Sequence, residues 1–171
     1  MYKPEKNEYA PYYETYVSLV PETDVIPALA AQPGELRNAV AGLPEEKGTY
    51  AYADGKWTIK ELLSHLIDGE RMFAYRVLRI SRGDETPIEG FEQDGYIENS
   101  HANNRSFAEL LDEFDLVRRA NLLMLKNMDA DGWARMGTAS DNPVSARALV
   151  NIMIGHVRHH ERILRERYLV K

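Results

Sequence analysis

Residues 57–83 read WTIKELLSHLIDGERMFAYRVLRISRG and carry the clearest helix signal in the chain. Thr58 is suited to cap a helix, and Glu61, three residues later, completes a capping box. Glycine at position 83 is suited to the left-handed conformation that often ends a helix. The stretch therefore predicts one amphipathic helix of about 25 residues. Its apolar positions recur at helical spacing, at Leu62, Leu66, Phe73, Val77 and Ile80.

Three further segments combine helical periodicity with start and stop signals, at 33–43, 106–128 and 145–168. Pro33 is expected to open the first of them, after a short helical region at 23–31 that is interrupted near Pro27. Four helices joined by turns predict an all-α fold, a four-helix bundle with a long loop between the second and third helices. We assign the bundle to residues 23–171 and a tyrosine-rich N-terminal arm to residues 1–22.

The long loop runs from Asp84 to Arg105, a stretch of 22 residues. It contains proline and glycine and mixes aromatic with polar side chains. Loops of this length without secondary structure are usually functional or disordered. The loop is therefore expected to be a lid, an interface or a disordered segment.

Composition narrows the classes of function. The 171 residues are enough for one domain, and a net charge of −6 has the wrong sign for a broad nucleic-acid or anionic-membrane surface. The chain has no cysteine, which excludes disulfides, cysteine-ligated zinc, iron–sulfur clusters and a cysteine nucleophile. Without a signal peptide or a long apolar run, we expect a cytoplasmic protein with neither nucleic acid nor membrane as a partner.

Three of the five histidines lie close together in the last predicted helix. His156 and His160 are four residues apart, so their side chains project in nearly the same direction and can bind one metal ion. At about 100° per residue, this pair falls in the middle of the apolar face. His159 lies nearer the edge of that face and is the weaker candidate ligand.

His65 lies beside the apolar stripe of the second helix and can also face inward. A lone inward histidine is more often a packing residue than a ligand. Two neighbouring imidazoles on an apolar stripe would each need a separate partner without a metal, so the pair favours ligation. Three histidine ligands would leave open positions for water or substrate, which is typical of catalytic metal sites. His101, in the long loop, is expected to be exposed.

Motifs for other chemistries are missing. Val157 stands where the zinc-protease motif His-Glu-x-x-His has its glutamate, so a general base is missing there. Glu61 and Asp68 flank His65 and would be the candidate carboxylates for hydrolysis. The chain has neither a glycine-rich phosphate loop nor a serine-centred elbow, so nucleotide binding and serine hydrolysis have no support.

Four motifs carry a resemblance to a known family: WTIKELLSHL at 57–66, GFEQDGY at 90–96, PVS at 143–145 and GHVRHHERIL at 155–164. Together they resemble the DinB-like superfamily, which includes proteins named as metal-dependent hydrolases, over about residues 24 to 168. The resemblance implies a four-helix bundle with a divalent metal, often nickel or zinc, on one histidine of the second helix and two of the last. The matching positions here are His65, His156 and His160. Members with known activity are mostly thiol-dependent transferases and isomerases, and members are often homodimers.

The leading hypothesis is a metal-dependent enzyme that transfers a low-molecular-weight thiol to an electrophilic small molecule beneath the long loop. Gln93, Asp94 and Tyr96 are the candidate pocket residues. One alternative is a metal-dependent hydrolase that uses metal-bound water. Another is a non-catalytic dimeric bundle that binds a metal or a small ligand, and a degenerate member with an empty site is a further possibility. The intact set of three histidines argues against the last of these.

Overall fold

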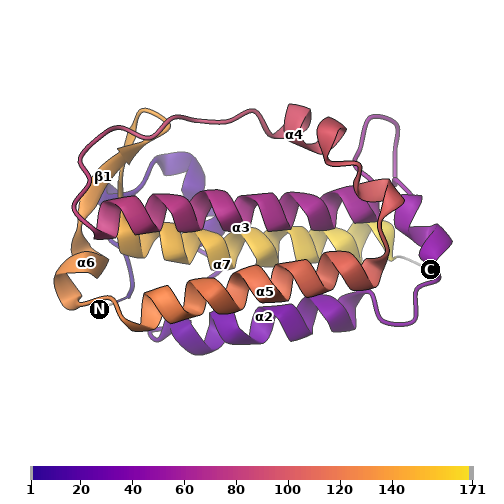
Figure 1. Cartoon of the computed structure of the whole chain (residues 1–171), viewed down its shortest axis with the longest axis horizontal. Helices are drawn as coiled ribbons and strands as arrows, with labels where there is room; N and C mark the ends of the chain where they lie inside the picture. The colour runs from indigo at the N-terminus through magenta and orange to yellow at the C-terminus, as the bar shows by residue number, and fades with distance from the viewer. Residues whose placement is uncertain (1, 170–171) are drawn as a thin grey trace.

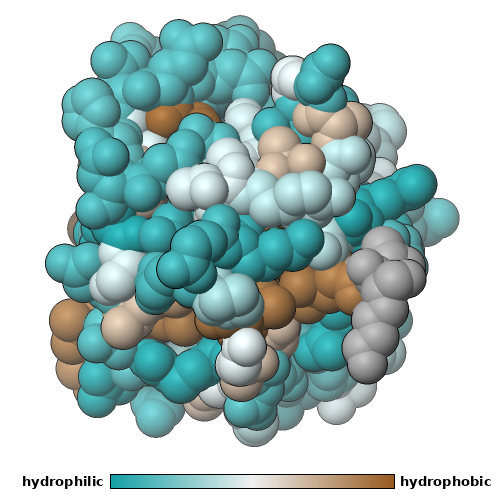
Figure 2. All heavy atoms as spheres, turned by 90° about the vertical axis from the view of Figure 1, so that its right-hand side faces the viewer, coloured by the Kyte–Doolittle hydropathy of each residue, from teal (hydrophilic) through white to brown (hydrophobic). Residues whose placement is uncertain are grey.

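The computed structural model describes residues 2–169, and four long helices lie side by side in it as a bundle (Figure 1). These helices are α2 (Val25–Ala39), α3 (Ile59–Ser81), α5 (Phe107–Lys126) and α7 (Ala146–Ile163). The predicted all-α class and the four-helix bundle are confirmed. No helix among the described residues is both long and apolar enough to cross a membrane. The end of the bundle on the right of Figure 1 is mainly hydrophilic, with a narrow hydrophobic band across it (Figure 2).

Helix α3 begins and ends where its sequence indicates. Thr58 Oγ1 accepts a hydrogen bond from the Glu61 backbone N–H, and the Glu61 carboxylate accepts one from Thr58 N–H, which is a complete capping box. Gly83 adopts a φ of 81° just beyond the helix. Its apolar stripe is buried against both α5 and α7, so α3 is the central helix around which the site is built.

Helices α3 and α5 run in the same direction, whereas α2 and α7 run in the opposite one (Figure 1). The N-terminal ends of α3 and α5 are joined through Glu45, which pairs with Lys60 and accepts a hydrogen bond from Phe107 N–H. The chain must therefore cross the whole bundle between α3 and α5, which explains the length of segment 84–105. That segment is partly ordered by α4 (Gln93–Ser100) and a 3-10 turn (Ala102–Asn104), and was wrongly expected to lack helix.

The prediction for α2 was wrong at its start, and the helix ends at Ala39 rather than at residue 43. The helix begins after Asp24, whose side chain caps it, and continues through Pro27 and Pro33 without a break. Pro27 lies in the first turn, where backbone N–H groups have no partner within the helix. Pro33 removes the donor for the Leu29 carbonyl, but Arg118 of α5 donates to that carbonyl at 3.0 Å. A side chain from another helix thus replaces the hydrogen bond that proline removes.

A small β-hairpin lies between α5 and α7 and was not predicted. After the short helix α6 (Ala130–Ala134), strand β1 (Met136–Ala139) pairs antiparallel with β2 (Asn142–Ser145). Ser140 and Asp141 form the turn with φ values of 50° and 62°, as a two-residue type I′ turn requires. Neither residue is the glycine that would mark such a turn in a sequence. Ser145 then caps α7, which continues as a π-helix (Leu164–Tyr168) to the predicted end.

The tyrosine-rich arm packs on the bundle rather than extending from it. It contains two 3-10 turns (Lys6–Glu8 and Pro11–Tyr13) and the short helix α1 (Glu14–Val17), which contacts α7. A Cβ atom on Gly155 of α7 would lie 2.0 Å from the Tyr16 carbonyl oxygen, so only glycine allows this approach. Arg158 of α7 donates to the Leu19 carbonyl and pairs with Glu22. These contacts hold the arm beside the histidines of α7.

Candidate metal centre

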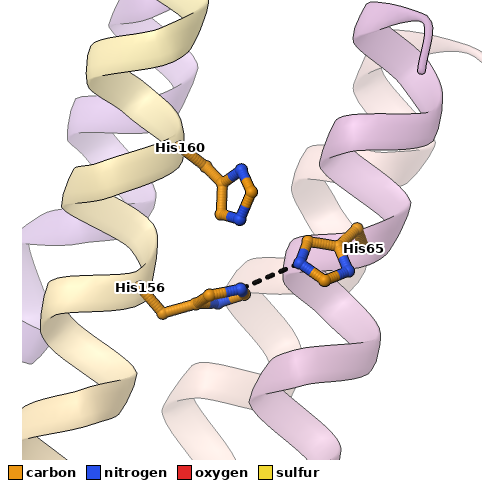
Figure 3. A group of neighbouring side chains, drawn as sticks. All are labelled: His65, His156 and His160. Atoms are coloured by element: carbon orange, nitrogen blue, oxygen red, sulfur yellow. Dashed lines mark hydrogen bonds between the residues drawn. The ribbon is translucent and has the colours of Figure 1, made fainter. Parts of the chain in front are cut away.

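His65, His156 and His160 point toward one another across the interface between α3 and α7 (Figure 3). One ligand nitrogen from each ring can be chosen so that all three lie within 4.8 Å of one another. The Nε2 atoms of His65 and His156 are 2.9 Å apart, so one of them carries a hydrogen and the other accepts it. The spacing of four residues on α7 places His156 and His160 one turn apart, and the antiparallel α3 brings His65 between them.

The environment keeps these imidazoles neutral. Burial lowers the pKa of His65 to about 4, although the charge of Asp94 opposes the shift. Burial and the neighbouring His65 and His159 lower the pKa of His160 to about 3. His156 is the most enclosed, and burial, followed by the neighbouring histidines and Arg118, keeps its pKa well below the usual range. Neutral imidazole is the form that binds a metal ion, so no proton has to be removed at neutral pH.

Close packing fixes the orientation of the rings. A Cβ atom on Gly69 would lie 2.9 Å from Cε1 of His156, so the absence of a side chain at position 69 creates the space for that ring. Tyr16 and Phe73 contact His156 edge-on, with ring centroids at 5.4 and 5.6 Å. The indole of Trp57 lies 4.6 Å from the His65 ring. The His65 and His156 imidazoles are therefore held by packing before any ligand binds.

This donor set fits a transition metal. Three imidazole nitrogens suit zinc, nickel, copper or iron, and three protein ligands leave positions open for another molecule. The three histidines form the one such group of His, Asp and Glu side chains found in residues 2–169. His159 lies outside the group, with its ring 5.1 Å from that of His160. A metal held by His65, His156 and His160 stays a prediction that the geometry permits.

Two cavities adjoin the histidines. The larger has a volume of about 530 Å³ and lies between the N-terminal arm, α3 and the segment before α4; it includes His65 and His156 in its wall. The smaller, of about 320 Å³, includes His160 and lies beside Trp57. Gln93, at the start of α4, lines both cavities. A metal held by the three rings would therefore face space large enough for a small molecule.

Comparison with known proteins places this chain in a family. The model of the DinB superfamily matches residues 28–164, which is most of the chain. The chain belongs to the DinB superfamily. A protein of Geobacillus thermodenitrificans named "Putative metal-dependent hydrolase" is 32% identical over 79 residues, which cover 46% of this chain and 44% of that protein.

The same architecture occurs in a solved structure. YfiT from Bacillus subtilis, described as a probable metal-dependent hydrolase with an unusual four-helix bundle topology, matches with a TM-score of 0.76 and 16% identity. The match covers 96% of this chain and 90% of YfiT. At this level of identity the match supports the fold of our DinB-superfamily protein and nothing about its chemistry.

The candidate pocket residues and His101 of this DinB-superfamily protein lie in different parts of the structure. Gln93 borders both cavities, and Asp94 lines the smaller one and is close enough to act on the pKa of His65. Tyr96 lines a separate surface pocket with Arg79 and is 48% exposed, so it is the candidate that the structure does not bring to the histidines. His101 is exposed, as expected.

The two carboxylates proposed for hydrolysis are engaged elsewhere in this DinB-superfamily protein. Glu61 accepts hydrogen bonds from the backbone N–H of Thr58 and from Asn103. Burial raises the pKa of Asp68, with Arg71 as the largest opposing charge, and neither Glu61 nor Asp68 joins the histidine group. A base for hydrolysis would therefore have to come from the segment around α4.

Several residues of the larger cavity in this DinB-superfamily protein were not predicted from the sequence. Arg76 follows His65 by eleven residues, a rotation of about 20° from the same direction at 100° per residue, so helical spacing could have found it. Other cavity residues come from segments whose position depends on tertiary packing. Among them are Tyr12, Tyr13, Thr15 and Tyr16 of the arm, Gly90 and Glu92 before α4, and Ser140 of the hairpin.

A second polar centre lies in the core of the same DinB-superfamily bundle. Arg118 of α5 donates from Nε and Nη2 to the two carboxylate oxygens of Glu70, at 2.8 Å each. Its Nη1 donates to Gln32 and to the Leu29 carbonyl, and Asn121 also donates to Glu70. Arg118 and Glu70 are almost completely buried. This network joins α2, α3 and α5 directly behind the turn of α3 that carries Gly69.

Proposed function

We propose that this protein is a metal-dependent enzyme that transfers a low-molecular-weight thiol to an electrophilic small molecule. A divalent transition metal, with zinc or nickel expected, would be held by His65, His156 and His160. The observation that carries the proposal is the convergence of three neutral imidazoles, of which His65 and His156 are buried and line a cavity of about 530 Å³, while His160 is half-buried. Membership of the DinB superfamily and the name of the Geobacillus protein support metal dependence.

The residues of the chain have separable tasks in this proposal. When bound, the metal supplies a Lewis acid that lowers the pKa of a thiol or of water. The neutral imidazoles offer their lone pairs, and the packing of Trp57 and Phe73 against them restricts access of water to the rings. Gln93 can orient a ligand from either cavity, since it borders both.

Thiol transfer is preferred over hydrolysis because no carboxylate in residues 2–169 joins the histidine group. Thiols ionise readily beside a metal, whereas attack by water commonly uses a positioned base. Hydrolysis is the second candidate, and Asp94 favours it, because this carboxylate is close enough to act on the pKa of His65. The Geobacillus relative is also named as a hydrolase. A non-catalytic binding bundle and a homodimer stay predictions.

Metal content is the first test. Protein purified without a histidine tag should contain about one transition metal per chain, and the His156→Ala/His160→Ala double variant should contain none. His101→Ala is the matched control, because His101 is exposed and lies outside the group, and it should keep the metal. Absence of metal from the wild type, even after incubation with zinc or nickel, would overturn the proposal.

The reaction class needs a second measurement on the loaded protein. If thiol transfer is correct, adding a low-molecular-weight thiol should change the visible spectrum of the cobalt-substituted protein and increase turnover of electrophilic substrates. Asp94→Asn should then leave turnover nearly unchanged. Turnover without any thiol, lost in Asp94→Asn while metal content is kept, would instead assign hydrolysis.

A further inference from the structure

Arg76 is a buried arginine of α3 without a carboxylate partner in the described part of the chain. Its side chain is almost inaccessible, with the residue 2% exposed. Its Nη2 donates to the Glu89 carbonyl at 3.1 Å and to Ser140 Oγ at 3.0 Å, and both acceptors are neutral. Its Nε is buried and has no hydrogen-bond partner. The positive charge of this guanidinium therefore has no counter-ion in the described part of the chain, and its Nε–H has no acceptor.

An unpaired buried charge is costly, because the ion loses its hydration without gaining a counter-ion. A purely structural bridge from α3 to Glu89 and Ser140 would need only a neutral donor, since both acceptors are neutral. The free Nε and the absence of a carboxylate indicate that part of the site is supplied by another molecule.

Arg76 lines the same cavity as His65 and His156. Eleven residues along α3 place it on the same face of the helix as His65 and about 16 Å further along the axis. Phe73 and Gly69 lie on this face between the two ends, so the cavity has a histidine end, an apolar middle and a cationic end. Glu92 is the carboxylate that borders this cavity, and it already accepts a hydrogen bond from the Asp94 backbone N–H at the start of α4.

We propose that Arg76 binds the carboxylate group of an elongated, partly aromatic small molecule whose other end reaches the three histidines. A guanidinium matches the planar carboxylate, and charge-assisted hydrogen bonds of this kind are stronger than neutral ones. The ring of Phe91 lies 6.0 Å from the guanidinium carbon, and Tyr12, Tyr13 and Tyr16 border the cavity. This assignment of substrate class rests on the proposed function, since it places the reacting end of the substrate at the metal centre.

The test compares an anionic probe with its neutral analogue on the full chain. Isothermal titration calorimetry of 4-phenylbutanoate and 4-phenylbutan-1-ol is carried out on chelator-treated protein, so that no carboxylate can bind a metal. We expect the carboxylate to bind at least tenfold more tightly than the alcohol. Equal affinity of the two probes would overturn the proposal, and this comparison needs no variant. If 4-phenylbutyl phosphate binds tenfold more tightly than the carboxylate, the preference for carboxylate is wrong.

Variants identify the residue responsible. Arg76→Gln should weaken 4-phenylbutanoate binding at least tenfold, and Arg76→Lys, which keeps the charge, should recover part of the loss. Arg82→Gln, at an exposed arginine just beyond α3, should bind as the wild type does. Unchanged affinity in a folded Arg76→Gln protein, with the melting temperature as the check, would overturn the assignment.

Failure of this proposal can be told apart from failure of the metal site. Arg76→Gln should keep about one metal per chain, whereas the His156→Ala/His160→Ala variant should lose the metal and still bind 4-phenylbutanoate. Metal without carboxylate binding would leave the proposed function standing and reject the substrate class.

Discussion

Two buried arginines lie on neighbouring helices of this bundle, and their surroundings differ. Every nitrogen of Arg118 has a partner within the chain, and its charge is paired with Glu70. Arg76 has two neutral acceptors, an unpartnered Nε and a cavity beside it. The network around Arg118 is closed, because all its donors are paired within the chain, and it holds helices together. The network around Arg76 is open, because one donor has no partner, and it is suited to receive a ligand. The histidine group belongs to the open kind, because its ring nitrogens face one another and a cavity.

The largest effect is expected where the closed network is broken. Arg118→Met leaves the Glu70 carboxylate buried without its partner and removes the donor to the Leu29 carbonyl beneath Pro33. We expect a loss of about 3–5 kcal/mol in the free energy of unfolding, measured by urea denaturation. Arg119→Met is the control, because Arg119 makes an exposed pair with Asp115, and it should cost less than about 1 kcal/mol.

Arg76→Met, measured in the same way, tests the difference between the two arginines, because this substitution leaves no buried carboxylate without a partner. It should cost far less than Arg118→Met, about 1 kcal/mol from the loss of its two hydrogen bonds. Equal losses for the two arginine variants would show that both networks are structural and would remove the distinction between them.

A smaller effect than that of Arg118→Met is expected from filling the space beside His156. Gly69→Ala places a Cβ atom 2.9 Å from the Cε1 atom of that ring, so the imidazole must move away from the position that it shares with His65. Displacing a ligand in this way should weaken metal binding by about 10- to 100-fold, measured by competition with a chelator.

Gly34→Ala is the matched control for this substitution. Gly34 lies within α2 and has open space around its Cα, so alanine should bind metal as the wild type does. It should also stabilise the helix by roughly 0.5–1 kcal/mol. Wild-type metal affinity in Gly69→Ala would mean that the rings are not held in place by packing.

Much of the fold and the histidine group could be predicted from the sequence, because local signals determine α3, α5 and α7. Thr58 with Glu61 marked the start of α3, and the spacing of four between His156 and His160 predicted that they share a face. What could not be predicted depends on distant partners. Pro33 continues α2 only because Arg118, 85 positions away, donates to the carbonyl that it leaves free.

Tertiary packing also explains the other misses. The Ser140–Asp141 turn has positive φ angles without glycine, so no residue type marked it. The position of Tyr16 beside His156 depends on the docking of the arm on α7. Arg76 was not predicted as a site residue, because a helical arginine is usually exposed. The sequence therefore predicted the histidine end of the cavity, whereas its other walls come from elements that only the folded chain brings together.

A smaller effect than that of Arg118→Met is also expected at a fully paired carboxylate that lies nearer the surface than Glu70. Burial raises the pKa of Glu8, but hydrogen bonds from Arg147 and Ser145 outweigh it and hold that pKa below its usual value. The pair stabilises the folded state fully above the unfolded-state pKa of Glu8, and this contribution is lost as the pH falls through the lower, folded-state pKa.

Glu8→Gln should therefore lower the free energy of unfolding at pH 7 by about 1–2 kcal/mol, and the difference from wild type should shrink toward pH 3. Urea denaturation at several pH values measures both quantities, and Glu85→Gln, at an exposed glutamate, should follow the wild type throughout. A difference that stays constant with pH would mean that Glu8 stabilises the arm by packing. In that case the closed pair would hold the arm beside the histidines through shape rather than through charge.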